Sequence, residues 1–71
     1  MTDHVYSVTE IVGSSESSIE EAIKNGIATA AKSLRQLEWF EITQLRGQID
    51  HGKVAHFQVQ MKVGFRIEEP S

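Results

Sequence analysis

Three side chains of complementary chemistry, Trp39, Arg46 and Gln58, lie in the second half of the chain. An indole can stack on a flat ring, a glutamine amide can donate and accept hydrogen bonds, and a guanidinium pairs with phosphate. On one surface, these groups would hold a planar heteroaromatic molecule by its face, its edge and an attached phosphate. The sequence therefore indicates a binding function, provided that the fold places the three residues on the same side of the protein.

Each of these residues also has an ordinary structural interpretation. An outward tryptophan in a small domain is frequently the anchor of a subunit contact, because aromatic residues are enriched in interfaces. Gln58 can be an exposed strand residue and Arg46 a surface charge. The same surface could therefore belong to a non-catalytic oligomeric interaction module in which Trp39 contacts a protein partner.

Catalytic and metal-binding signatures are absent from the sequence. It contains no GxSxG, no phosphate-binding glycine loop, no HExxH and no cysteine. His4, His51 and His56 lack the paired spacing of zinc ligands, and His51 and His56 have no carboxylate or serine partner at a motif spacing. We therefore expect neither an enzyme nor a metal site.

A strand and a helix are predicted in the first half of the chain. Residues 5–12 are rich in β-branched side chains and stop at Gly13, which is typical of a strand. Ser18 and Glu21 have the spacing of a capping box, so a helix should begin close to Ser18. From there, apolar residues recur at steps of three and four as far as Leu37, which predicts one buried face.

Two strands joined by a hairpin are predicted to follow. Residues 38–47 form the second strand, residues 48–52 the connection and residues 53–67 a long third strand, before a polar tail. Alternation along the third strand predicts a core face and an opposite polar face that includes Gln58. The core face consists of Ala55, Phe57, Val59, Met61, Val63, Phe65 and Ile67.

The position of Trp39 follows from alternation along the second strand. Phe40 and Ile42 are expected to contact the helix, which directs Trp39 to the opposite face. Strict alternation would leave Arg46 on the core side, so we expect a bulge at residues 43–44 that reverses the parity and places Arg46 with Trp39. Gln58 should then come within reach of Trp39 across the ladder.

The predicted fold class is α+β, in the order β-α-β-β. A right-handed crossover makes the first and second strands parallel, with the third strand antiparallel between them. One helix covers one face of this sheet, and no second layer is available for the other face. A long third strand would also extend beyond the helix, so part of it should meet another subunit or solvent.

Length and composition limit the class of protein. The chain has 71 residues, no cysteine and a formal charge of -3, which indicates a single domain spanning residues 1–71. Domains this small usually need disulfides, a metal or oligomerisation for sufficient stability. Because cysteines and a metal-ligand pattern are absent here, we expect self-association. The sequence has no run of basic residues, no apolar stretch of membrane length and no secretory signal. We therefore expect that the protein binds no nucleic acid, does not enter a membrane and is located in the cytoplasm.

The sequence resembles the dodecins, small bacterial and archaeal flavoproteins, along nearly its whole length. The blocks that carry the resemblance are Tyr6, residues 10–13, Ala22 with Ile23, residues 28–31, residues 39–41, residues 45–47, residues 57–59 and residues 62–66. The resemblance implies a β-α-β-β fold with its sheet partly wrapped around one helix, assembled as a hollow homododecamer.

The resemblance also implies a ligand and a site. Dodecins bind flavins as stacked pairs between the tryptophans of two subunits, and a glutamine bonds to the isoalloxazine edge; the matching residues here are Trp39 and Gln58. Arg46 is implied to contact the ribityl-phosphate region of FMN, and Arg66 matches a second basic position near the ligands. Bacterial members favour FMN and some hold coenzyme A, whereas archaeal members favour riboflavin or lumichrome. The implied role is flavin storage with quenching of its photochemistry; close stacking on both ring faces disfavours a flavin-dependent enzyme.

Overall fold

A computed structural model describes residues 3–67 of the chain, and the predicted polar tail lies outside this range. The elements are β1 (Tyr6–Ser15), α1 (Ile19–Ser33), β2 (Leu37–Asp50) and β3 (Lys53–Arg66). The strands form one sheet in the order β1-β3-β2, and both β1 and β2 run antiparallel to β3. The predicted β-α-β-β order, with β3 in the centre, is therefore confirmed.

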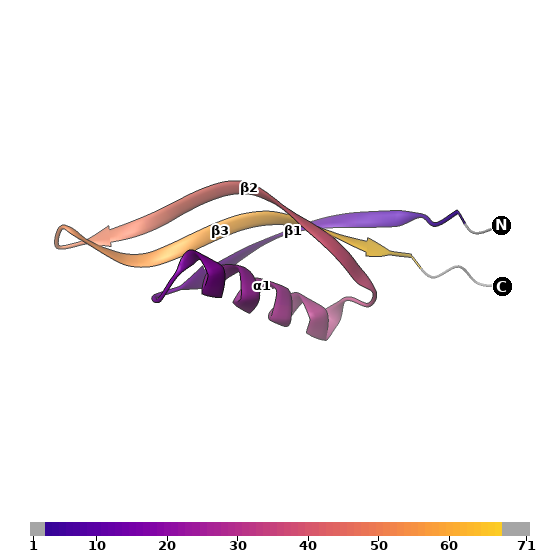
Figure 1. The fold of residues 1–71 in the computed structure, drawn as a ribbon, viewed down its shortest axis with the longest axis horizontal. Helices are drawn as coiled ribbons and strands as arrows, with labels where there is room; N and C mark the ends of the chain where they lie inside the picture. The colour runs from indigo at the N-terminus through magenta and orange to yellow at the C-terminus, as the bar shows by residue number, and fades with distance from the viewer. Residues whose placement is uncertain (1–2, 68–71) are drawn as a thin grey trace.

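The helix lies along one face of the sheet, and the β2–β3 hairpin extends beyond it (Figure 1). Both ends of the described chain lie at the opposite end of the molecule from this hairpin. The long axis of the molecule measures 56 Å, whereas the other two measure 20 and 14 Å. The hairpin turns through His51 and Gly52, whose φ angles of 51° and 75° are typical of a type I′ turn.

The hydrophobic core is small and lies between α1, β1 and β3. Val59, Met61 and Val63 of β3 are fully buried, as predicted, against Ala22 of the helix. Phe40 and Ile42 of β2 were expected to contact the helix, but they remain 47% and 46% exposed. Both lie on the helix side of the sheet as predicted, opposite Val63 and Met61, but α1 packs mainly on β1 and β3, so they are only partly covered.

The ends of the helix show one correct and one wrong prediction. Ser18 is the N-cap, and its hydroxyl accepts a hydrogen bond from the Glu21 backbone N–H at 3.0 Å. The helix ends at Ser33, however, and Leu37 begins β2. Leu37 packs against the core from the sheet, so it continues the apolar stripe without continuing the helix.

Gly13 lies inside β1, which continues to Ser15, and does not end it as predicted. A methyl group at Gly13 would overlap with the backbone carbonyl oxygen of Ala22. The glycine therefore serves close packing between β1 and α1, a known role of glycine within strands.

Gly13→Ala should consequently separate the helix from the sheet. We expect a loss of about 1–3 kcal/mol in the free energy of unfolding, the usual cost of overpacking. Urea unfolding at a fixed protein concentration measures this loss. Ser14→Ala, at the exposed neighbouring position, is the control and should change stability by less than about 0.5 kcal/mol. Equal stability of the two variants would contradict the packing role of Gly13.

Candidate functional site

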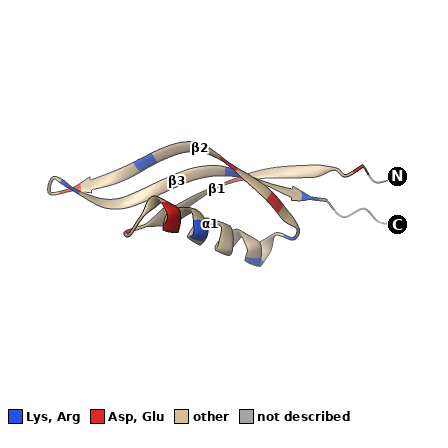
Figure 2. Cartoon of the chain, in the orientation of Figure 1, with Lys and Arg blue, Asp and Glu red and all other residues tan. Residues whose placement is uncertain are grey.

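The face of the sheet away from α1 is called the open face here. Strand alternation and the pairing register place alternate residues of each strand on it. Positive and negative side chains are interspersed over the sheet and helix, and no element carries a block of one sign (Figure 2). The open face contains Tyr6, Glu10, Trp39, Glu41, Gln44, Arg46, Gln58, Gln60, Lys62, Gly64 and Arg66.

Trp39 lies on the open face, as predicted, directly over Gly64 of the neighbouring strand. The two residues are paired in the ladder, and a methyl group at Gly64 would overlap with the indole ring. The Tyr6 ring meets the indole at a centroid distance of 5.1 Å and an interplanar angle of 67°. Trp39 is nevertheless 43% exposed, so the sheet supports an indole that is still accessible to a ligand or a partner.

Arg46 and Gln58 form a second group on the same face. The register shifts between Ile42 and Gln44, which is the bulge that the sequence predicted, and the Thr43 hydroxyl donates to the Gln60 carbonyl oxygen at 3.1 Å. This bulge turns Arg46 toward the open face opposite Gln58. The Arg46 Nε donates to Gln58 Oε1 at 3.2 Å.

Trp39 and Gln58 do not meet within one chain, which corrects the prediction that they come within reach of each other. Trp39 pairs with Gly64, whereas Gln58 pairs with Arg46, and the two rungs are six residues apart along β3. At about 3.3 Å per residue, their separation is roughly 20 Å. An indole and an amide can therefore contact one small ligand only if a second chain supplies one of them.

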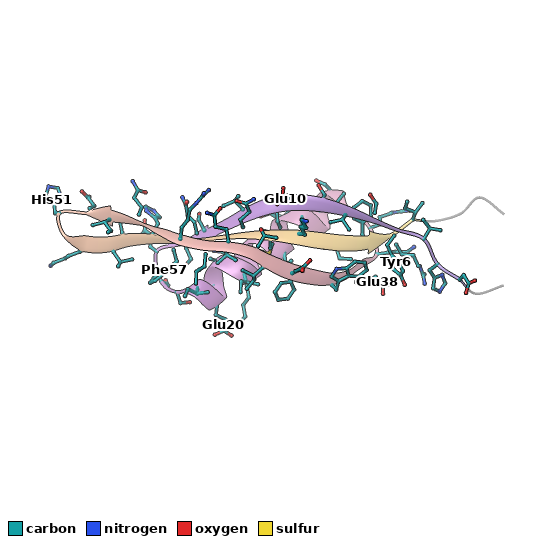
Figure 3. All side chains as sticks on the ribbon, turned by 90° about the horizontal axis from the view of Figure 1, so that it is seen from above. Tyr6, Glu10, Glu20, Glu38, His51 and Phe57 are labelled. Atoms are coloured by element: carbon teal, nitrogen blue, oxygen red, sulfur yellow. The ribbon has the colours of Figure 1, made fainter. Side chains whose placement is uncertain are left out.

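Arg66 belongs to the same end of the sheet as Trp39. It pairs with Tyr6, and its Nε donates to Gln36 Oε1 at 2.7 Å. Figure 3 shows Tyr6 and Glu38 at this end and His51 at the far tip of the hairpin. Sequence reasoning had not assigned Gln36 or Gly64 to the site, although a glycine within a strand is a signal of close approach by another group.

Two of the three histidines, His51 and His56, lie close to a carboxylate. His56 Nε2 lies 3.5 Å from Glu16 Oε2, and His51 Nδ1 lies 2.9 Å from Asp50 Oδ1. Asp50 adjoins His51 in the sequence and Glu16 precedes His56 by 40 residues, so neither contact has the spacing of a catalytic motif. Within residues 3–67, no three His, Cys, Asp or Glu side chains are arranged to hold a metal ion.

The fold and the open face together define a small α+β protein with an exposed indole and two arginines on one uncovered face of its sheet. The family model of the dodecins matches residues 5–68. A dodecin of Thermus thermophilus is 48% identical over 65 residues, which cover 92% of this chain and 94% of that protein. This chain belongs to the dodecin family. The dodecameric assembly of the family supports self-association of this chain.

Solved dodecin structures match the whole fold. The dodecin of Streptomyces davaonensis has a TM-score of 0.93 and 50% identity, and the match covers 96% of this chain and all of that one. The dodecin of Streptomyces coelicolor has a TM-score of 0.93 and 51% identity, with 99% and 100% of the two chains covered. In the described part of this chain, the helix is too short and too polar to span a membrane.

The contact between Trp39 and Gly64 can be tested by spectroscopy, because Trp39 is the single tryptophan of the chain. Gly64→Ala should displace the indole, shift its emission to longer wavelength and lower stability by about 1–3 kcal/mol. Tyr6→Phe is the control, since phenylalanine keeps the ring contact and should leave the emission maximum in place. An unchanged emission spectrum of Gly64→Ala would show that the indole does not rest on Gly64.

Proposed function

We propose that this protein stores and sequesters FMN, held as stacked pairs between the Trp39 rings of two subunits. The main support for this proposal is the position of Trp39. Its indole is half exposed on the open face and is held in place by Gly64 and by the edge-on contact with Tyr6. An indole supported in this way offers its ring surface for stacking without rearrangement of the sheet.

The remaining residues provide the groups that a flavin requires. The isoalloxazine edge carries donors and acceptors, which the Gln58 amide complements, and the phosphate of FMN complements a guanidinium. Arg46 lies beside Gln58, so a glutamine and an arginine would act together on the same ligand. Since Trp39 lies roughly 20 Å from this pair in its own chain, the complete site requires at least two subunits.

Variants of a relative support the choice of residues. Solved structures of Thermus thermophilus dodecin include variants in which a tryptophan is replaced by phenylalanine and two separate arginines are replaced by alanine. In that protein the first arginine follows the tryptophan by seven residues, and the second follows after twenty more. Trp39, Arg46 and Arg66 have the same spacing here.

A flavin that is stacked between two indoles is better suited to storage than to catalysis. A ring covered on both faces leaves little room for a substrate, and close contact with an electron-rich aromatic ring quenches the excited flavin. Bound FMN would thus be protected from light and prevented from sensitising photochemistry. By the same resemblance, coenzyme A is a second candidate ligand, and riboflavin is an alternative flavin.

Trp39→Ala should remove most of the flavin binding and leave the dodecamer intact. We expect the affinity for FMN to fall roughly 100-fold, because ring stacking contributes about 1–3 kcal/mol for each aromatic contact. Titration of the apoprotein with FMN, followed by flavin fluorescence, measures this loss, and size-exclusion chromatography checks the assembly. Trp39→Phe should retain part of the quenching. Full quenching by the alanine variant would refute the proposal, as would a colourless wild-type protein that cannot be reconstituted with flavin.

Arg46→Ala should weaken the binding of FMN more than the binding of riboflavin, since only FMN carries a phosphate. Loss of one charge-assisted hydrogen bond predicts about a tenfold larger loss for FMN. Parallel titrations with the two flavins give the ratio of affinities for each variant. Arg35→Ala, which removes a positive charge elsewhere, is the control. An equal loss of FMN and riboflavin would exclude a phosphate contact by Arg46.

A further inference from the structure

Both arginines of the open face are oriented by amide oxygens. Arg46 donates from Nε to Gln58 Oε1 at 3.2 Å and from Nη1 to Gln44 Oε1 at 3.5 Å. Arg66 donates from Nε to Gln36 Oε1 at 2.7 Å, and its Nη1 lies 3.4 Å from Nε2 of His4. Among residues 3–67, no carboxylate lies within ion-pair distance of the Arg46 or Arg66 guanidinium.

Gln36 holds Arg66 at two points. Its backbone carbonyl oxygen accepts the Arg66 N–H at 3.0 Å, and its side-chain oxygen accepts the Arg66 Nε–H at 2.7 Å. Gln36 lies between the end of α1 and the start of β2. Its φ is 58°, in the left-handed region of backbone conformation that residues other than glycine seldom adopt. The connection between helix and strand therefore places this amide beside the guanidinium.

Arg66 lies next to the indole. It is two residues from Gly64, over which Trp39 lies, and it pairs with Tyr6, whose ring contacts the indole. Residues two apart on a strand share a face and are about 7 Å apart. A planar molecule stacked on Trp39 would therefore have the Arg66 guanidinium close to its rim.

The chemistry of the partner determines what charge Arg66 can offer. A carboxylate would orient the guanidinium and also neutralise it, whereas an amide oxygen orients it and leaves the full positive charge. In a chain of net charge -3, an oriented cation that no carboxylate of residues 3–67 compensates, next to an aromatic ring, suits an anionic planar ligand.

We propose that Gln36 is a positioning residue that makes the site selective for a phosphorylated flavin over a neutral one. It does so by orienting Arg66 without cancelling its charge. This inference rests on the proposed function, because it assumes that a flavin stacks on Trp39.

The test compares two substitutions that separate orientation from charge. Gln36→Glu keeps the acceptor oxygen and the side-chain length but adds a negative charge beside Arg66. Gln36→Gly removes the acceptor, and glycine tolerates the left-handed backbone, so the connection should still fold. Lys24→Gln changes the net charge by the same single unit as Gln36→Glu on an exposed helix position and serves as the control.

FMN and riboflavin are titrated against each apoprotein, and the ratio of the two affinities is the readout. Gln36→Glu should lower the preference for FMN about tenfold, and Gln36→Gly about threefold, while riboflavin affinity stays within about twofold of wild type. Lys24→Gln should leave the ratio unchanged. An unchanged ratio in Gln36→Glu, or an equal fall in both affinities, would overturn the positioning role.

Failure of this inference can be distinguished from failure of the proposed function. If wild-type protein binds and quenches riboflavin but the Gln36 variants keep the wild-type ratio, stacking on Trp39 stands and the role of Gln36 is rejected. If wild-type protein quenches neither flavin, the proposed function itself is refuted, and the inference is refuted with it.

Discussion

The structure depends on a mismatch in length between one helix and the sheet that it covers. α1 has 15 residues and is about 22 Å long, whereas β3 has 14 residues and extends over about 46 Å. The helix can therefore bury the middle of β3 and little of β2. Large apolar side chains such as Leu45, Ile49 and Val54 stay more than half exposed in the single chain. Exposed apolar side chains of this kind are typical of surfaces that other protein chains cover.

The same mismatch leaves the open face available for function. No second layer of residues 3–67 covers it, so residues there are free to be polar or aromatic without a cost in core packing. The indole of Trp39 and the pair of Arg46 and Gln58 occupy separate rungs of this face. Under the proposed function, this separation means that two chains would have to contribute to one site.

Alternation along the strands predicted much of this arrangement from the sequence. The outward position of Trp39 follows from placing Phe40 and Ile42 on the helix side, and the bulge follows from the need to keep Arg46 out of the core. Errors arose where one signal had two physical meanings. Gly13 resembles a strand end but provides space for the helix, and Leu37 continues the helical stripe but lies on a strand.

The contact expected between Trp39 and Gln58 shows a different limit of sequence reasoning. Parity identifies the face of a residue, but the distance along the face depends on the register between strands, which the hairpin turn and the bulges set together. Gln36 could not be assigned from the sequence either. Its contact with Arg66 joins residues 30 positions apart through a connection whose conformation no local pattern indicates.

The irregular pairing of β2 has a consequence for solubility. β2 is an outer strand of 14 residues, and a long, flat strand with free N–H and C=O groups is a template for fibril growth. Its pairing with β3 shifts register between Leu37 and Trp39, between Ile42 and Gln44, and between Gln48 and Ile49. Each shift bends and twists the strand. A regular strand pairs poorly along an edge bent in this way, so the bulges that orient the side chains also disfavour edge-to-edge pairing of β2.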